Sequence, residues 1–110
     1  MTKPPIRSPF GKYITHLEQV DKNVKNKEEF GSILILSLVE EVGEMARAYL
    51  AEHGRKPTNL AAQRDETYEQ ELGDMIVAIL RFARIKNIDL HKRVMYTIRK
   101  IEKRKTEPKE

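Results

Sequence analysis

Two short groups of acidic residues, Glu40, Glu41 and Glu44 and then Glu71 and Asp74, interrupt stretches that are otherwise apolar. Residues three or four apart on a helix share a face, so each group points two carboxylates in one direction. If the two segments pack side by side, the carboxylates converge where like charges repel and burial is costly unless positive charge lies among them. Oxygen ligands bind hard divalent cations, and Mg²⁺ is the usual ion where a substrate carries phosphates, with Mn²⁺ able to substitute. The spacing therefore predicts a carboxylate site for Mg²⁺.

The alternative is that these acids form a solvated helix face, as most charge runs do. Two observations weigh against it. Glu41 shares its helical row with Leu34 and Ala48, which is the kind of stripe that a bundle helix buries. Arg47 is the one basic residue within a turn of either group, so surface ion pairing explains the acids poorly.

The elements that must position these acids are four predicted helices. Their expected ranges are residues 10–24, 28–53, 66–86, with a stop at Asn87, and 89–104, with Asp89 as the N-cap. Short connections between the helices predict an all-α fold, an antiparallel four-helix bundle. No run alternates with the period of a strand.

The domain organisation follows from the same pass along the chain. Residues 1–9 contain three prolines and are expected to form an extended arm, residues 10–104 a single helical domain, and residues 105–110 a charged tail. Residues 55–65 are expected to be a connection, with a short helical turn at 60–63.

The third predicted helix is apolar around nearly its whole circumference, and such a helix is buried on every side. A bundle of 110 residues leaves one flank of it in water. A second subunit is expected to cover that flank, which predicts a homo-oligomer, a dimer or a tetramer.

Composition narrows the class of protein. The chain has no cysteine, which excludes disulfides and thiolate metal sites, and it lacks an apolar run of the ~20 residues that span a membrane. A cytoplasmic protein is expected. Residues 31–74 carry 4 basic and 9 acidic residues, whereas residues 75–110 carry 11 basic and 4 acidic residues. An acidic cluster beside a cationic helix suits a site for metal and polyphosphate.

The order of the two acidic motifs resembles the MazG-like family of nucleoside triphosphate pyrophosphohydrolases, whose signature is E-E-x-x-E followed by E-x-x-D. The resemblance covers roughly residues 30 to 104. It implies Mg²⁺-dependent hydrolysis of an ordinary or modified nucleoside triphosphate to the monophosphate and pyrophosphate, on a helical domain built from pairs of subunits. It also implies that Glu41, Glu44, Glu71 and Asp74 hold the metal, and Glu40 could orient or deprotonate the attacking water or bind a further ion.

The fourth predicted helix departs from the family. Thr97 and Ile101 stand where related chains commonly carry Lys and Asn, and Arg104 alone matches the basic end. Lys100 and Arg104 are the expected substrate-binding residues there. Arg81, on the same row as Asp74, is expected either to reach a phosphate or to pair with Glu44.

None of the three histidines completes the E-x-x-H spacing of di-iron bundles, which favours an all-carboxylate site over a redox site.

Two other functions remain open. The first is a non-catalytic bundle that keeps the metal for assembly, which would show the same pattern of acids. A basic helical module that binds nucleic acid would explain the last third of the chain, although the acids would repel that ligand.

Overall fold

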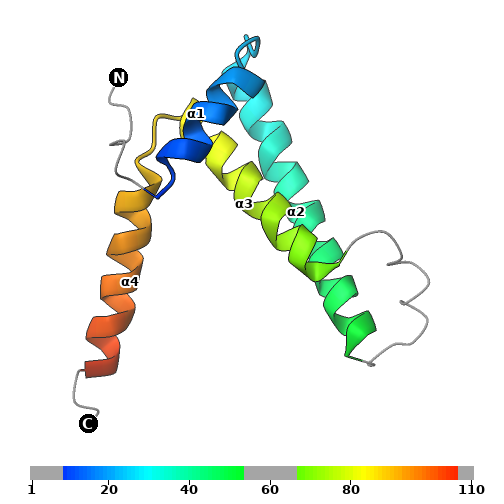
Figure 1. Ribbon diagram of the computed structural model, residues 1–110, viewed down its shortest axis with the longest axis vertical. Helices are drawn as coiled ribbons and strands as arrows, with labels where there is room; N and C mark the ends of the chain where they lie inside the picture. The colour runs from blue at the N-terminus through cyan, green and yellow to red at the C-terminus, as the bar shows by residue number, and fades with distance from the viewer. Residues whose placement is uncertain (1–8, 54–66, 107–110) are drawn as a thin grey trace.

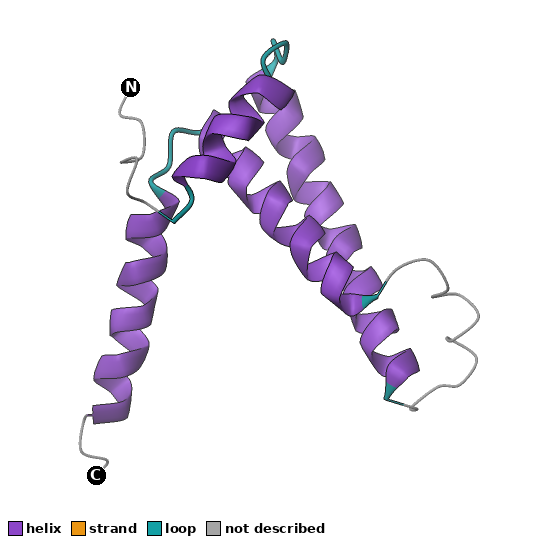
Figure 2. Cartoon of the chain, in the orientation of Figure 1, coloured by secondary structure: helices purple, strands orange, loops and turns teal. Residues whose placement is uncertain are grey.

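The computed structural model describes residues 9–53 and 67–106, and this part of the chain is entirely helical (Figures 1 and 2). It contains four α-helices: α1 (Gly11–Val20), α2 (Lys27–Glu52), α3 (Tyr68–Ile85) and α4 (Leu90–Thr106). The predicted all-α class is confirmed, and the helix order is the one expected. Residues 1–8 of the predicted arm, the connection at 54–66 and residues 107–110 of the predicted tail lie outside the described residues.

Helix ends are set by local side chains. Asn26 Oδ1 accepts a hydrogen bond from Glu29 N (2.9 Å) at the start of α2, and Thr67 Oγ1 accepts one from Gln70 N (3.2 Å) at the start of α3. Asp89 caps α4, as predicted, by accepting from Lys92 N (3.1 Å). Each cap satisfies a backbone N–H that the helix itself leaves without a partner.

The end of α3 is a Schellman turn at the predicted stop. Asn87 has φ of 56°, a left-handed conformation that Asn tolerates better than most residues. Its N–H donates to Arg84 O (3.2 Å), and the N–H of Ile88 donates to Ala83 O (2.9 Å). The chain therefore turns sharply between α3 and α4.

The α2 and α3 helices form a long antiparallel hairpin, and α1 packs on the α3 side of it (Figure 1). Gly31 lies where α2 meets α3, since a Cβ atom there would be in van der Waals contact with Phe82 Cε2, at 3.4 Å. The buried apolar residues are shared by the three helices: Ile14, Leu34, Ala48, Ala78, Leu80, Ala83 and Ile85. The core is thus a thin layer between α2 and α3, extended by α1.

The fourth helix does not complete a bundle within the chain. It runs away from the hairpin, and the main helix contacts join α2 with α3 and α1 with α3 (Figure 1). The radius of gyration is 17.5 Å, against about 13 Å for a compact domain of this length. The predicted antiparallel four-helix bundle is therefore wrong for the single chain, because the turn at Asn87 directs α4 outward.

A buried ion pair ties α1 to α3. Arg81 donates from Nε to Asp21 Oδ2 (2.9 Å) and from Nη2 to Asp21 Oδ1 (2.7 Å), and its guanidinium lies 5.0 Å from the Phe30 ring centroid. The hydrogen bonds to Asp21 raise the pKa of Arg81 above its ordinary value, while burial acts in the opposite direction. The ion pair holds the loop after α1 against the C-terminal part of α3.

Helix boundaries differ from expectation chiefly at α1. It ends at Val20 rather than Val24, because Asp21 leaves the helix to bind Arg81. At the other end of the chain α4 continues to Thr106, two residues beyond the predicted limit. Among the described residues, no helix combines the length and apolar character that crossing a membrane needs.

Candidate metal centre

The α2 side of the site consists of Glu41 and Glu44, one turn apart on the face that packs toward α3. On the same face, Leu34 and Ala48 are buried, and both glutamates are partly shielded from solvent. The helical row predicted to be buried, which contains Leu34, Glu41 and Ala48, therefore faces α3. A freely solvated acidic face does not describe these two residues.

The α3 side is provided by Glu71, which is only 1% exposed. Thr67 caps the helix, and the backbone N–H of Glu71 donates to Thr67 O (3.1 Å). Glu71 therefore lies close to the N-terminal end of α3, where the helix dipole favours negative charge by about 0.3–1 kcal/mol. That gain is small against the cost of burying a carboxylate, and a cation between the helices would add to it.

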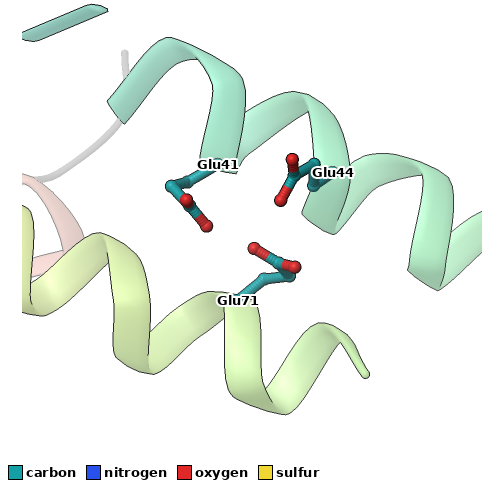
Figure 3. A group of neighbouring side chains, drawn as sticks. All are labelled: Glu41, Glu44 and Glu71. Atoms are coloured by element: carbon teal, nitrogen blue, oxygen red, sulfur yellow. The ribbon is translucent and has the colours of Figure 1, made fainter. Parts of the chain in front are cut away.

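The three carboxylates meet between the two helices (Figure 3). One oxygen each of Glu41, Glu44 and Glu71 lies within 4.8 Å of the others. Helix pairing thus brings together side chains that are thirty residues apart along the chain. The site is a small, partly shielded cluster of oxygen ligands.

A divalent cation fits this cluster by its chemistry. Glu41 Oε2 is buried and receives no hydrogen bond from any described residue. A buried carboxylate oxygen without a donor is costly, and a cation is a partner that would offset the cost. The donor set is all oxygen, which suits Mg²⁺ or Mn²⁺.

Asp74 and Glu40 were predicted for the same site but lie outside the three-residue group. Asp74 is one turn along α3 from Glu71, and its Oδ1 accepts a hydrogen bond from Gln70 Nε2 (3.0 Å). Glu40 is exposed on α2. Both remain close in sequence to the cluster, and their predicted roles stay predictions.

The predicted substrate-binding residues lie elsewhere. Arg81 pairs with Asp21, so the expected alternative pairing with Glu44 is wrong. Asp21 is the partner because it leaves α1 beside Arg81, and it takes two of the guanidinium N–H groups. Lys100 and Arg104 are exposed on α4, which does not pack on the hairpin.

Sequence reasoning missed one supporting residue. Gln70 both donates its backbone N–H to the Thr67 cap and holds Asp74 through its side chain. Its signal was present as the T-x-x-Q pattern of a helix start and as the four-residue spacing to Asp74. Gln70 therefore takes part in the N-cap of α3 and also orients Asp74, a predicted metal ligand.

Fold and site together define an all-α protein with a carboxylate cluster suited to a divalent cation. Residues 29–107 match the family described as the MazG nucleotide pyrophosphohydrolase domain, which is most of the chain, and the chain belongs to this family. The suspected resemblance is confirmed. No curated protein and no solved structure matches the chain.

Proposed function

We propose that this protein is a Mg²⁺-dependent pyrophosphohydrolase that converts a nucleoside triphosphate, ordinary or modified, to the monophosphate and pyrophosphate. The convergence of Glu41, Glu44 and Glu71 carries the proposal, because three carboxylates within 4.8 Å favour a cation between two helices. Membership of the MazG domain family supports the class of reaction. The cut between the α and β phosphates is part of the proposal.

The roles of the residues follow from their positions. Glu41, Glu44 and Glu71 would hold Mg²⁺, with Asp74 joining them by turning from Gln70. The bound ion supplies charge that neutralises phosphate oxygens and lowers the pKa of water. Glu40, the exposed neighbour of Glu41 in the sequence, is proposed to accept the proton of the attacking water.

Positive charge for the outer phosphates is assigned to Lys100 and Arg104. Because α4 runs away from the hairpin, these side chains are proposed to serve a cluster on another copy of the chain. Phosphate binding by Arg81 stays part of the proposal, because Asp21 takes only two of its guanidinium N–H groups and the side chain is 29% exposed.

Several surfaces favour assembly into a homo-oligomer. A strip of α2 leaves large apolar side chains exposed, namely Ile35, Leu36, Val39 and Val42. Between α1 and α3 lies an open apolar groove of ≈ 570 Å³, lined by Tyr13, His16, Leu17, Leu72, Gly73, Ile76, Val77 and Leu80. No atom of the described residues lies within 4 Å of a Cβ built at Gly73, although glycine within a helix costs about 0.5–1 kcal/mol. Exposed apolar surface of this extent marks an interaction site.

The assembly proposal predicts that Ile76→Glu disrupts the oligomer. Ile76 is 50% exposed in the groove, so a charge there costs little in the monomer and much in a buried interface. Sedimentation at micromolar concentration should show a dimer or larger species for the wild type and a smaller one for the variant. Gln19→Glu adds the same charge at an exposed polar position and should change nothing. A fully active monomeric wild type would overturn the proposal.

The reaction is tested by adding Mg²⁺ and a panel of ordinary and damaged nucleoside triphosphates and measuring pyrophosphate release. Release from at least one of them, lost on chelation, is the expected result. The alternative function, a non-catalytic metal-binding bundle, is suggested by the unusual Thr97 and Ile101. It predicts metal binding without release from any triphosphate.

Metal binding should also stabilise the fold. An ion that binds the native state alone contributes about 2.7 kcal/mol at a concentration one hundred times its dissociation constant, which is a rise in Tm of about 10 °C. Calorimetry of the metal-free protein with added MgCl₂ should show this rise for the wild type and almost none for Glu41→Gln. Equal shifts in the two proteins would place the ion elsewhere.

A further inference from the structure

The fourth helix has two opposite faces. Leu90, Val94, Ile98 and Ile101 form an apolar face by their spacing of three and four residues. A second set lines a shallow hollow of ≈ 450 Å³, consisting of Lys92, Arg93, Tyr96, Arg99, Lys100 and Lys103. At 100° per residue the centres of the two faces are roughly 160° apart around the helix.

This opposition fixes where the basic face points. An amphipathic helix normally buries its apolar face. On α4, Ile98 and Ile101 of that face are exposed, and the main helix contacts of the chain do not involve α4. A partner that covers Ile98 and Ile101 leaves the opposite side of the helix, with Lys92, Arg99 and Lys103, facing solvent. These three cations therefore stay accessible when a partner covers the apolar face, whereas Lys100 and Arg104 lie closer to that face around the helix.

The charge on this face is not balanced locally. From Leu90 to Thr106 the helix has seven lysines and arginines against one acid, Glu102, so it carries more positive charge than the net +4 of the whole chain. No cation of α4 forms an ion pair with another described residue. The helix thus presents a concentrated positive potential, which attracts polyanions.

We propose that the outer face of α4 binds single-stranded nucleic acid. Lys92 to Lys103 spans about 16 Å along the helix axis, which is long enough to follow several backbone phosphates. Tyr96, 62% exposed at the centre of the cations, offers a ring on which a base can stack. Cations that track a backbone around an exposed aromatic ring are the features by which proteins hold single strands.

A membrane surface fits the helix less well. Helices that lie in a bilayer interface insert an apolar face rich in Trp, Phe or Leu. The apolar face of α4 contains one Leu and no aromatic residue, and its only aromatic side chain, Tyr96, lies among the cations. The proposal rests on Lys92, Tyr96, Arg99 and Lys103, none of which has a part in the proposed hydrolysis, so it does not depend on that reaction.

The test is fluorescence anisotropy of labelled 12-mer oligonucleotides, single-stranded and duplex, with the full chain at several salt concentrations. We expect preference for the single strand and a slope of log K against log salt of about −2 to −3.5, as for three to five phosphate contacts. The triple variant Lys92→Glu, Arg99→Glu, Lys103→Glu should bind more than tenfold more weakly. Tyr96→Ala should weaken single-strand binding about fivefold or more and leave duplex binding unchanged.

A matched control separates the face from bulk charge. Lys22→Glu, Lys25→Glu, Lys27→Glu reverses three exposed charges near the start of α2 and should reduce binding less than threefold. Circular dichroism should show unchanged helix content in both triple variants, and pyrophosphate release, where present, should be unchanged. Equal weakening in the two variants would overturn the proposal. So would binding to anionic phospholipid vesicles with none to the oligonucleotides.

Discussion

Exchange of Glu71 or Glu41 for glutamine is expected to lower the Mg²⁺-dependent rate of pyrophosphate release by about two orders of magnitude or more. Removing a group that only supports a metal ligand typically lowers metal affinity or activity 10–100-fold. Loss of a ligand oxygen should therefore lower the rate by at least the upper end of that range. The amide keeps the shape of the side chain but withdraws the charge that holds the cation. Steady-state rates at several Mg²⁺ concentrations measure the effect.

The same exchange at Glu41 should not destabilise the metal-free protein. Its Oε2 is buried without a donor, and the carboxylates of Glu44 and Glu71 lie within 4.8 Å. Removing one charge relieves repulsion on the order of 1 kcal/mol after screening by solvent, so the apoprotein Tm should stay or rise by a few degrees. Glu69→Gln, at an exposed position in the first turn of α3, is the matched control: it should leave the rate unchanged and lower Tm by at most a few degrees, because a charge favoured by the helix dipole is lost. A large loss of apoprotein stability in Glu41→Gln would make this acid a structural partner.

The three-residue cluster could be predicted because its information is local to each helix. Spacing of three residues placed Glu41 with Glu44, and the apolar row through Leu34 and Ala48 indicated which face turns inward. Only the pairing of two helices was then needed to bring in Glu71. The position of Asp74 was harder to foresee, since it depends on the Gln70 side chain that holds it.

The partner of Arg81 could not be predicted from periodicity. Asp21 lies sixty residues away and is presented by the turn after α1, so no helical row connects the two residues. The direction of α4 was equally inaccessible, because it follows from backbone angles at Asn87 and not from the amphipathic pattern. The sequence predicted the stop there but not that the next helix would turn away from the hairpin.

Loss of Arg81 is expected to cost far more stability than loss of the other ion pair that the described residues form, between Lys86 and Glu28. Asp21 has a side chain only 3% exposed, and Arg81→Met leaves its carboxylate buried without the cation. Breaking a buried pair in this way costs about 3–5 kcal/mol, a large share of the 5–15 kcal/mol that stabilises a typical domain. Asp21→Asn should cost less, about 1–2 kcal/mol, because Arg81 is 29% exposed and can regain water.

Urea unfolding followed by circular dichroism, at one fixed protein concentration, measures these differences. Lys86→Met is the matched control: its partner Glu28 is 89% exposed, and such pairs contribute about 0–1 kcal/mol. Equal losses in Arg81→Met and Lys86→Met would show that the buried pair is not a special anchor of α1. Hydrolysis assayed at low temperature, where the variant remains folded, then distinguishes structure from catalysis. If the pair only fixes α1 on α3, Arg81→Met should have the KM of the wild type. If Arg81 binds a phosphate of the substrate, the KM of the variant should be higher.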